Sequence, residues 1–253
     1  MKSILSYSRA DIEAGLAAYA PTAKNRLRVL FAPVHITEEN FETACRLYAN
    51  LKNTSYDDVI IIERFLDNGT KRLPMISDAI IETPLGEVPV NDVLRNDFCD
   101  EDDDFYIDDL GRHENMSLPE HLMMLQCTLA NDFRVLSLQI TDERPSIVRE
   151  LAAGVAEILR ERNALIIVCA EAAEADKNGL QEVQRLAAEQ NFSRMLNYIN
   201  TGDAGVQGGG PLAAGILLSH NWELETCLMI PGKDAHIACL AGYAGLPVYE
   251  TQS

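Results

Sequence analysis

The chain has 253 residues, of which 47% are hydrophobic and 24% are charged. This length and composition are typical of a globular protein with a sizeable core. With 21 basic and 39 acidic residues, the formal net charge is −18. That balance argues against binding to nucleic acid or to an anionic membrane surface, because both require basic patches. No run of about 18 apolar residues occurs, so we expect no transmembrane helix.

Two further features favour a cytoplasmic location. The first eleven residues contain no apolar stretch of the kind found in secretion signals. The six cysteines are far apart and form neither a C-x-x-C motif nor a zinc-ligand pair, so we expect reduced thiols within the core. They are Cys45, Cys99, Cys127, Cys169, Cys227 and Cys239.

Apolar runs of strand length alternate with helical patterns in the first half of the chain. Residues 27–34 predict a strand, 38–51 a helix and 58–65 a second strand. Residues 79–90 predict a short hairpin around a Pro-Leu-Gly turn. The acid-rich segment 97–109 does not have the spacing of a calcium-binding loop, and we expect it to be a solvated loop.

The same alternation continues in the second half of the chain. A helix is predicted from Ser117, where Glu120 completes a capping-box pattern. Strands at 134–140 and 164–170 follow, separated by a helix at 145–162, and helices are predicted at 181–200 and 211–222. Strands joined by helices favour a mostly parallel or mixed sheet with helices on both faces. Because no repeat or Ser/Gly linker divides the chain, we predict a single three-layer α/β domain over residues 1–253.

Local catalytic motifs are weak. No histidine stands in a metal-binding H-x-x-x-H pattern, and the neighbours Ser219 and His220 do not face each other on a helix. The glycine run 208–210 precedes a predicted helix, where backbone N–H groups could hold an anion. It matches neither a dinucleotide fingerprint nor a P-loop, and the other interpretation is a flexible turn. The histidines are His35, His113, His121, His220 and His236.

Two segments have a distinctive sequence, namely 56–62 (YDDVIII) and 83–90 (TPLGEVPV). Weaker matches follow in a fixed order, from Pro33 and Tyr48 through 117–126 and 208–211 (GGGP) to 241–244 (AGYA). Together they resemble the Memo-like family, the B member of the AmmeMemoRadiSam set. The resemblance covers about residues 26–248 and leaves 1–25 unmatched. It implies the fold of the class III extradiol dioxygenases of the LigB type.

The resemblance also locates the family's site, where histidines, an aspartate and a cysteine surround a possible metal. It places Val34, Leu66 and Met116 where the family has histidines, and Gln207 where it has the cysteine. A further family segment, S-D-x-x-H, falls on 170–174, which retains the carboxylates of Glu171 and Glu174 but has no imidazole. Extradiol cleavage needs Fe(II) held by two imidazoles and a carboxylate. We therefore expect neither a bound metal nor another cofactor.

These positions and their neighbours are expected to form one binding cleft. The preferred prediction is a non-catalytic module that binds a small molecule or a protein, with homo-oligomerisation left open. The alternative is an Fe(II)-dependent dioxygenase-like enzyme with a rebuilt site. That site would use Glu171, Glu174 and Asp67 with His35 or His236, and a β-bulge at residues 33–34 could turn His35 toward it. The predicted cleft residues are Val34, His35, Leu66, Asp67, Met116, Glu171, Glu174, Gln207, Gly208 and Gly209.

Overall fold

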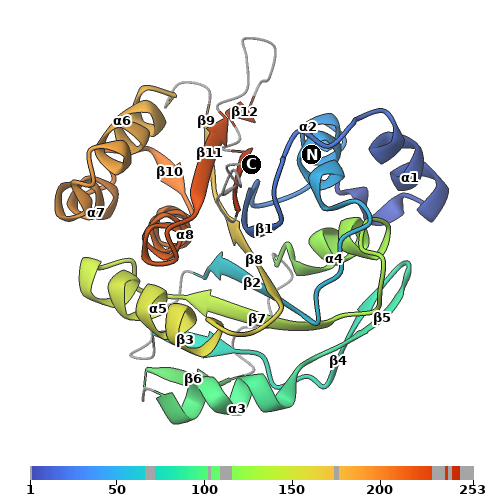
Figure 1. The fold of residues 1–253 in the computed structure, drawn as a ribbon, viewed down its shortest axis with the longest axis horizontal. Coiled ribbons are helices and arrows are strands. Elements are labelled where there is room, and N and C mark those ends of the chain that lie inside the picture. Colours follow the sequence, from blue (N-terminus) through green and yellow to red (C-terminus); the bar gives the residue numbers. More distant parts are fainter. Residues whose placement is uncertain are drawn as a thin grey trace, which may run out of the picture.

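An eight-stranded sheet forms the centre of the computed structural model, with the strand order β11-β13-β1-β8-β2-β7-β3-β6 (Figure 1). The structure describes residues 2–65, 72–101, 104–108, 116–173, 177–229, 237–238 and 241–245. Four neighbouring strands at the centre run parallel. They are β1 (Leu27–Ala32), β8 (Ala164–Cys169), β2 (Asp58–Arg64) and β7 (Arg134–Ile140). These are the four strands that the sequence predicts, so the prediction of a central sheet is confirmed.

Antiparallel pairs make the sheet mixed. On one side β13 (Ala241–Gly245) pairs with both β1 and β11 (Glu225–Met229). On the other side β3 (Leu73–Met75) pairs antiparallel with β7 and parallel with β6 (Phe105–Ile107). The predicted hairpin is confirmed as β4 (Ile80–Thr83) and β5 (Gly86–Pro89). A small sheet joins β9 (Glu171–Ala173) to β10 (Val206–Gln207) and β12 (Ile237–Ala238).

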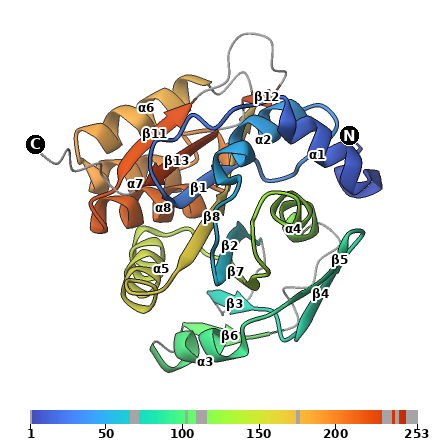
Figure 2. The ribbon, with the colours of Figure 1, turned by 45° about the vertical axis from the view of Figure 1, so that its right-hand side comes forward.

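Helices cover both faces of the sheet, as predicted for an α/β domain (Figures 1 and 2). One core cluster includes side chains of five helices and the other includes side chains of three. The first group is α3 (Asp92–Glu101), α5 (Pro145–Ile158), α6 (Lys177–Ala188), α7 (Phe192–Asn200) and α8 (Gly209–Asn221). The second group is α1 (Arg9–Ala17), α2 (Phe41–Tyr48) and α4 (Leu118–Gln126). Short 3₁₀ turns lie at Ile4–Ser6 and Ala49–Leu51.

The central strands are hydrophobic on both faces because both faces are covered. Along β2, Ile60 and Ile62 enter one core cluster, whereas Val59 and Ile61 enter the other. This alternation follows from the two-residue period of a strand. It explains why the sequence shows an uninterrupted apolar run instead of an alternating one.

The structure corrects two predicted elements. The single helix predicted at 181–200 is two helices, since Gln190 has a φ of 55°, in the left-handed region, and ends the helical path between α6 and α7. The acid-rich segment is not a loop throughout, because α3 extends to Glu101 and β6 follows. There Phe98 and Phe105 are buried with ring centroids 5.1 Å apart, and this burial outweighs the acidic composition.

The cysteines are only partly core residues. The five described ones are free thiols, of which Cys45 and Cys169 are buried, while Cys227 is exposed on β11. The expectation of a core thiol is therefore wrong for Cys227, and Cys239 lies outside the described residues. Within the described ranges, no helix has the length and apolar character needed to cross a membrane.

Truncating the centre of β2 should show how much the two-sided burial contributes. Ile60 is fully buried, whereas Ile80 on β4 is 48% exposed. We expect Ile60→Ala to lower the free energy of unfolding by about 2–5 kcal/mol. The matched control Ile80→Ala should change it by less than about 0.5 kcal/mol. Urea denaturation measures both, and equal losses would contradict this description of the core.

Candidate functional site

The carboxyl ends of β1, β8 and β2 meet at one edge of the sheet. Ala32 pairs with Cys169, and Ile62 pairs with Val168, so the three strands end nearly level. The polar residues that follow these strands are therefore brought together, as expected for open parallel sheets.

Glu171 ties β9 to the segment that follows β1. Its carboxylate lies close enough to the backbone N–H groups of Val34 and His35 for them to favour its ionised form. Burial raises the pKa of the Glu171 carboxyl, and the charge on His35 and these two N–H groups oppose that shift. Gln207 of β10 pairs directly with Glu171. Four of the predicted residues are thus neighbours, although they span more than 170 positions of sequence.

Gly208 makes this pairing sterically feasible. Its φ is 75°, and a Cβ added there would lie 2.3 Å from the carbonyl oxygen of Cys169. The backbone of the glycine run therefore packs directly against the end of β8. Gly209 instead packs against α7, where its Cβ would lie 2.5 Å from Ile199 Cγ2.

Glu120 on α4 holds the other side of His35. Its Oε2 lies 3.2 Å from His35 Nδ1 and accepts a hydrogen bond from the Ile36 backbone N–H at 3.1 Å. The Ser3 hydroxyl donates to Oε1. The hydrogen bond with Glu120 raises the pKa of His35 above its usual 6.5. Burial opposes ionisation of Glu120, but the hydrogen bonds from His35 and Ser3 outweigh it and lower the pKa of that carboxyl.

Glu63 anchors the start of α4. Its Oε1 accepts hydrogen bonds from both the backbone N–H of Ser117, at 2.9 Å, and the Ser117 hydroxyl. The predicted capping box is therefore wrong, because the Ser117 side chain binds Glu63 and the Glu120 side chain binds Ser3 and His35. Glu63 Oε2 is buried and has no hydrogen-bond partner. Burial raises the pKa of the Glu63 carboxyl, against the opposing effect of the Ser117 bonds.

A buried network lies beneath these carboxylates. The Tyr48 hydroxyl is 2.6 Å from His121 Nδ1, and Cys169 Sγ is 3.4 Å from Nε2. Burial lowers the pKa of His121 to about 4 and raises the pKa of the Cys169 thiol well above 9. Both groups are consequently neutral near pH 7, and the pair is not a thiolate–imidazolium pair.

The predicted residues divide into three groups. Val34, His35, Glu171, Gln207 and Gly208 come together at the strand ends. Met116 is half-buried next to Ser117 and packs on the α4 side of the core, while Gly209 faces α7. Leu66, Asp67, Glu174 and His236 lie outside the described residues.

Sequence reasoning missed most of the buried polar groups at this edge. Glu63 and Cys169 stand in apolar strand runs, where nothing marks them as functional. The adjacent Glu120 and His121 occupy one turn of α4, and the structure shows that both are at most 4% exposed. A buried charged residue in an apolar helix would have been the available signal. The missed residues are Tyr48, Glu63, Ser117, Glu120, His121 and Cys169.

The donor set of the described residues does not fit the Fe(II) site that a resemblance to the class III extradiol dioxygenases would imply. Among the described residues, no group of three or more His, Cys, Asp or Glu side chains is arranged to hold a metal ion. Instead, His35 is hydrogen-bonded to Glu120, His121 to the Tyr48 hydroxyl and Glu63 to the Ser117 N–H. A two-imidazole, one-carboxylate set is absent from this part of the chain.

The glycine run also does not present a free anion site at Gly210. The Gly210 N–H donates to Glu143 Oε1 at 2.6 Å, and Glu143 Oε2 forms an ion pair with Arg64 Nε at 3.0 Å. A carboxylate of the protein thus already occupies the amino-terminal end of α8.

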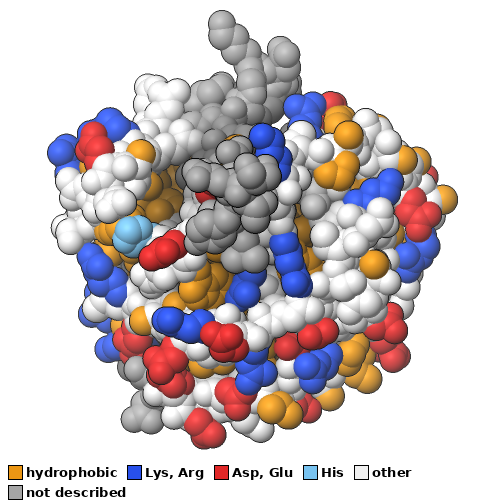
Figure 3. All heavy atoms as spheres, in the orientation of Figure 1, with side chains coloured by type: hydrophobic (Ala, Val, Ile, Leu, Met, Phe, Trp, Pro, Cys, Tyr) orange, Lys and Arg blue, Asp and Glu red, His pale blue; other side chains and the backbone are white. Residues whose placement is uncertain are grey.

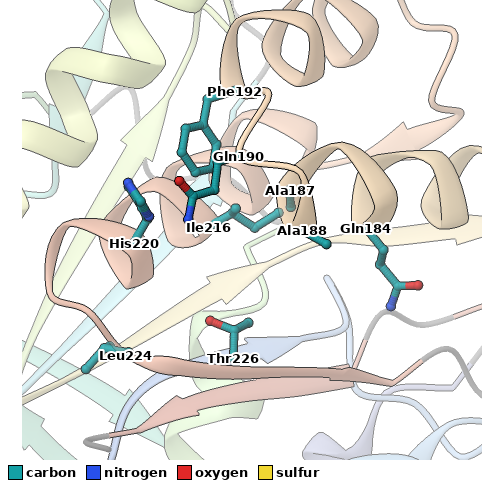
Figure 4. A pocket seen from close by; sticks show the side chains of 9 residues that line it. All are labelled: Gln184, Ala187, Ala188, Gln190, Phe192, Ile216, His220, Leu224 and Thr226. Carbon is teal, nitrogen blue, oxygen red and sulfur yellow. The ribbon is translucent and has the colours of Figure 1, made fainter.

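A cavity of about 450 Å³ lies elsewhere, near the carboxyl end of α8 (Figure 4). It is lined by Phe192, Ile216, His220, Leu224 and neighbouring residues, and hydrophobic side chains are visible around a hollow on this face in Figure 3. His220 is eleven residues beyond Gly209, which corresponds to about 16 Å along a helix. The cavity is therefore separate from the strand-end residues.

Comparisons with known proteins agree on one family. A family model described as Memo-like protein matches residues 7–228, which extends further toward the N-terminus than the resemblance from residue 26. A MEMO1 family protein of Nitrosopumilus maritimus (strain SCM1) is 24% identical over 142 residues, which are 56% of this chain and 52% of the relative. The match therefore spans about half of that relative.

A solved structure has a similar architecture. The uncharacterized protein JW3007 from Escherichia coli K12 aligns with a TM-score of 0.57 and 11% identity, over 87% of this chain and 98% of that one. At this identity the likeness shows the fold alone.

His35 and His121 should titrate on opposite sides of pH 6.5. We expect His35 to titrate above 6.5 and His121 near 4. Because the folded pKa of His121 is lowered, its stabilising contribution is complete above about pH 6.5 and is lost as the pH falls toward 4. The loss amounts to about 3 kcal/mol. Histidine NMR measures the pKa values and denaturation measures stability; a His121 pKa near 6.5 would refute the buried network.

Replacing Gly208 with alanine should destabilise the protein far more than the same change at Gly202, where the added Cβ has open space around it. Gly202 also has positive φ, 81°, but an added Cβ there would meet nothing within 4 Å. Gly202→Ala should cost about 1 kcal/mol from backbone strain. Gly208→Ala adds the overlap with Cys169 and should cost at least about 2 kcal/mol more. Thermal denaturation compares them, and equal effects would exclude the close approach.

Proposed function

Because the chain belongs to the Memo-like protein family, we propose that it is a member that binds ligands at the strand ends without metal chemistry. The observation that carries this proposal is that candidate metal ligands already form hydrogen bonds within the protein. Glu63 accepts hydrogen bonds from Ser117, and His35 is hydrogen-bonded to Glu120. A metal would have to break these contacts before it could use the same oxygen and nitrogen atoms.

The buried cysteine and histidine also favour a non-catalytic role. Cys169 is 1% exposed and His121 is fully buried, so neither reaches a substrate in this conformation. Their neutral states near pH 7 provide neither a thiolate nucleophile nor a protonated acid.

The accessible groups define the chemistry of the ligand. The His35 side chain is 36% exposed, Val34, Met116 and Glu171 are half-buried, and Gln207 is exposed. When ionised, the carboxylates of Glu63, Glu120 and Glu171 at this edge only accept hydrogen bonds. We therefore propose a small polar ligand that donates hydrogen bonds, such as one carrying an ammonium group.

The second candidate is the rebuilt dioxygenase-like enzyme. It is favoured by the position of His35, whose partially exposed imidazole lies close to the carboxylates of Glu120 and Glu171. Asp67, Glu174 or His236 would have to supply the remaining ligands.

Metal content and oxygen consumption separate the two candidates. Protein grown with iron and zinc and purified without a histidine tag should hold far less than one metal per chain and consume no oxygen with catechols. Near-unit occupancy that disappears in His35→Ala or Glu171→Ala, but persists in the distant Glu157→Ala control, would establish the rebuilt enzyme.

The binding role needs its own measurement. In NMR titrations with ammonium, neutral and carboxylate compounds of similar size, the ammonium compounds should shift the His35 ring signals. Glu171→Gln should weaken this binding at least about tenfold, whereas Glu157→Gln should not. If no compound of any charge affects His35, the proposed binding site is wrong.

The cellular setting completes the proposal. We propose a cytoplasmic protein whose natural ligand is a small molecule or protein, with no nucleic acid and no membrane partner. Light scattering of the purified chain tests whether it forms a homo-oligomer.

A further inference from the structure

The β5 strand (Gly86–Pro89) and the segment 131–134, which leads into β7, diverge from a common junction, and we call this pair of segments the fork. Val90, just after β5, pairs in parallel with Val135, and the Asn91 N–H donates to the Val135 carbonyl at 2.9 Å. Before this junction, residues 86–89 and 131–134 lead to the two bridged positions from the same direction. A cavity of about 810 Å³ is lined by both segments.

One wall of the fork is a strand with an unused edge. In the two-stranded sheet, β5 pairs only with β4 among the described strands. A strand edge of this kind can accept an extended chain through backbone hydrogen bonds. Pro89 has no N–H, so the Glu87 N–H and the carbonyl groups of Glu87 and Pro89 are the groups available to such a chain.

The hairpin is held in place before anything binds. The Thr83 hydroxyl donates to the Gly86 carbonyl at 2.8 Å, and Gln126 of α4 donates to the same carbonyl at 3.3 Å. Gly86 has a φ of 124°, a conformation that glycine adopts without strain. A wall fixed in this way lowers the entropic cost of binding a partner.

The cavity combines an apolar base with an acidic rim. Leu85, Val88, Leu125, Leu129 and Phe133 supply apolar surface. The exposed side chains of Glu87 and Asp132 lie on the rim, and no ion pair among the described residues involves either carboxylate.

Arg9 is the one basic residue among the described residues that line the cavity, and it is already engaged. Arg9 donates to the Gln126 carbonyl at 2.8 Å and lies 3.8 Å from the Glu13 carboxylate. Charge complementarity therefore favours a basic occupant, in keeping with the net charge of −18.

We propose that this fork is a docking site for an extended basic segment of a partner protein. The segment adds a strand beside β5, places apolar side chains over Leu125 and Phe133, and directs Lys or Arg side chains toward Glu87 and Asp132. The alternating arrangement follows from the period of a strand, whose successive side chains point to opposite faces. This surface is distinct from the strand-end site, so neither proposal depends on the other.

The test uses the full chain and two capped peptides, Lys-Val-Lys-Val-Lys and Glu-Val-Glu-Val-Glu. The lysine peptide should bind at low salt, more weakly at high salt, and should slow hydrogen exchange of the Glu87 amide and of amides at 131–134. Glu87→Lys with Asp132→Lys should weaken this binding at least about tenfold. The milder pair Glu87→Gln with Asp132→Asn removes the same two charges and should also weaken binding. It provides the test if the charge-reversed variant does not fold.

A matched control separates docking from general attraction to an acidic protein. Glu39→Lys with Glu157→Lys makes the same change in charge at exposed positions elsewhere and should leave binding within about twofold. Equal weakening by both pairs, equal binding of both peptides, protection only outside the fork, or no binding of the lysine peptide would each overturn the proposal.

Discussion

Buried polar groups at the ends of parallel strands must find hydrogen-bond partners within the protein, and this requirement organises the strand-end region. Where the chain leaves β1, the N–H groups of Val34, His35 and Ile36 no longer belong to a strand ladder. Glu120 accepts a hydrogen bond from Ile36, and the Glu171 carboxylate lies near the N–H groups of Val34 and His35. Because these carboxylates come from β9 and α4, the same contacts fix those elements on the sheet.

These hydrogen bonds limit the ability of the strand-end carboxylates to bind a metal. A carboxylate oxygen that already accepts a hydrogen bond within the protein cannot also bind a metal without leaving its donor unpaired, which costs about 1–3 kcal/mol for each donor. Glu120 is in this situation, since it accepts hydrogen bonds from Ile36 and Ser3. These contacts contribute to structure, and we propose that the remaining polar groups recognise a ligand.

The sequence predicts the sheet much better than the buried network beside it. The four central strands are visible because two-sided burial gives uninterrupted apolar runs, and the Pro-Leu-Gly turn identifies the hairpin. Tertiary packing determines the rest: Phe98 and Phe105 make ordered structure within an acidic segment, and Gln190 divides a helix. The family resemblance leads to Glu171, His35 and Gln207. No local pattern leads to Glu63 with Ser117, or to Tyr48 with His121, because these partners are 54 and 73 residues apart.

The two proposed surfaces differ in what a ligand must displace. At the strand ends, Glu120 and Glu63 Oε1 already accept hydrogen bonds within the protein, so a ligand that uses these oxygens competes with those bonds. Selectivity there depends on how well the ligand replaces the lost bonds. In the fork, the outer edge of β5 and the carboxylates of Glu87 and Asp132 have no such bonds to other described residues, so a partner would gain its contacts directly. We therefore expect hydrogen-bond geometry to govern binding at the strand ends, and charge and the addition of a strand to govern docking in the fork.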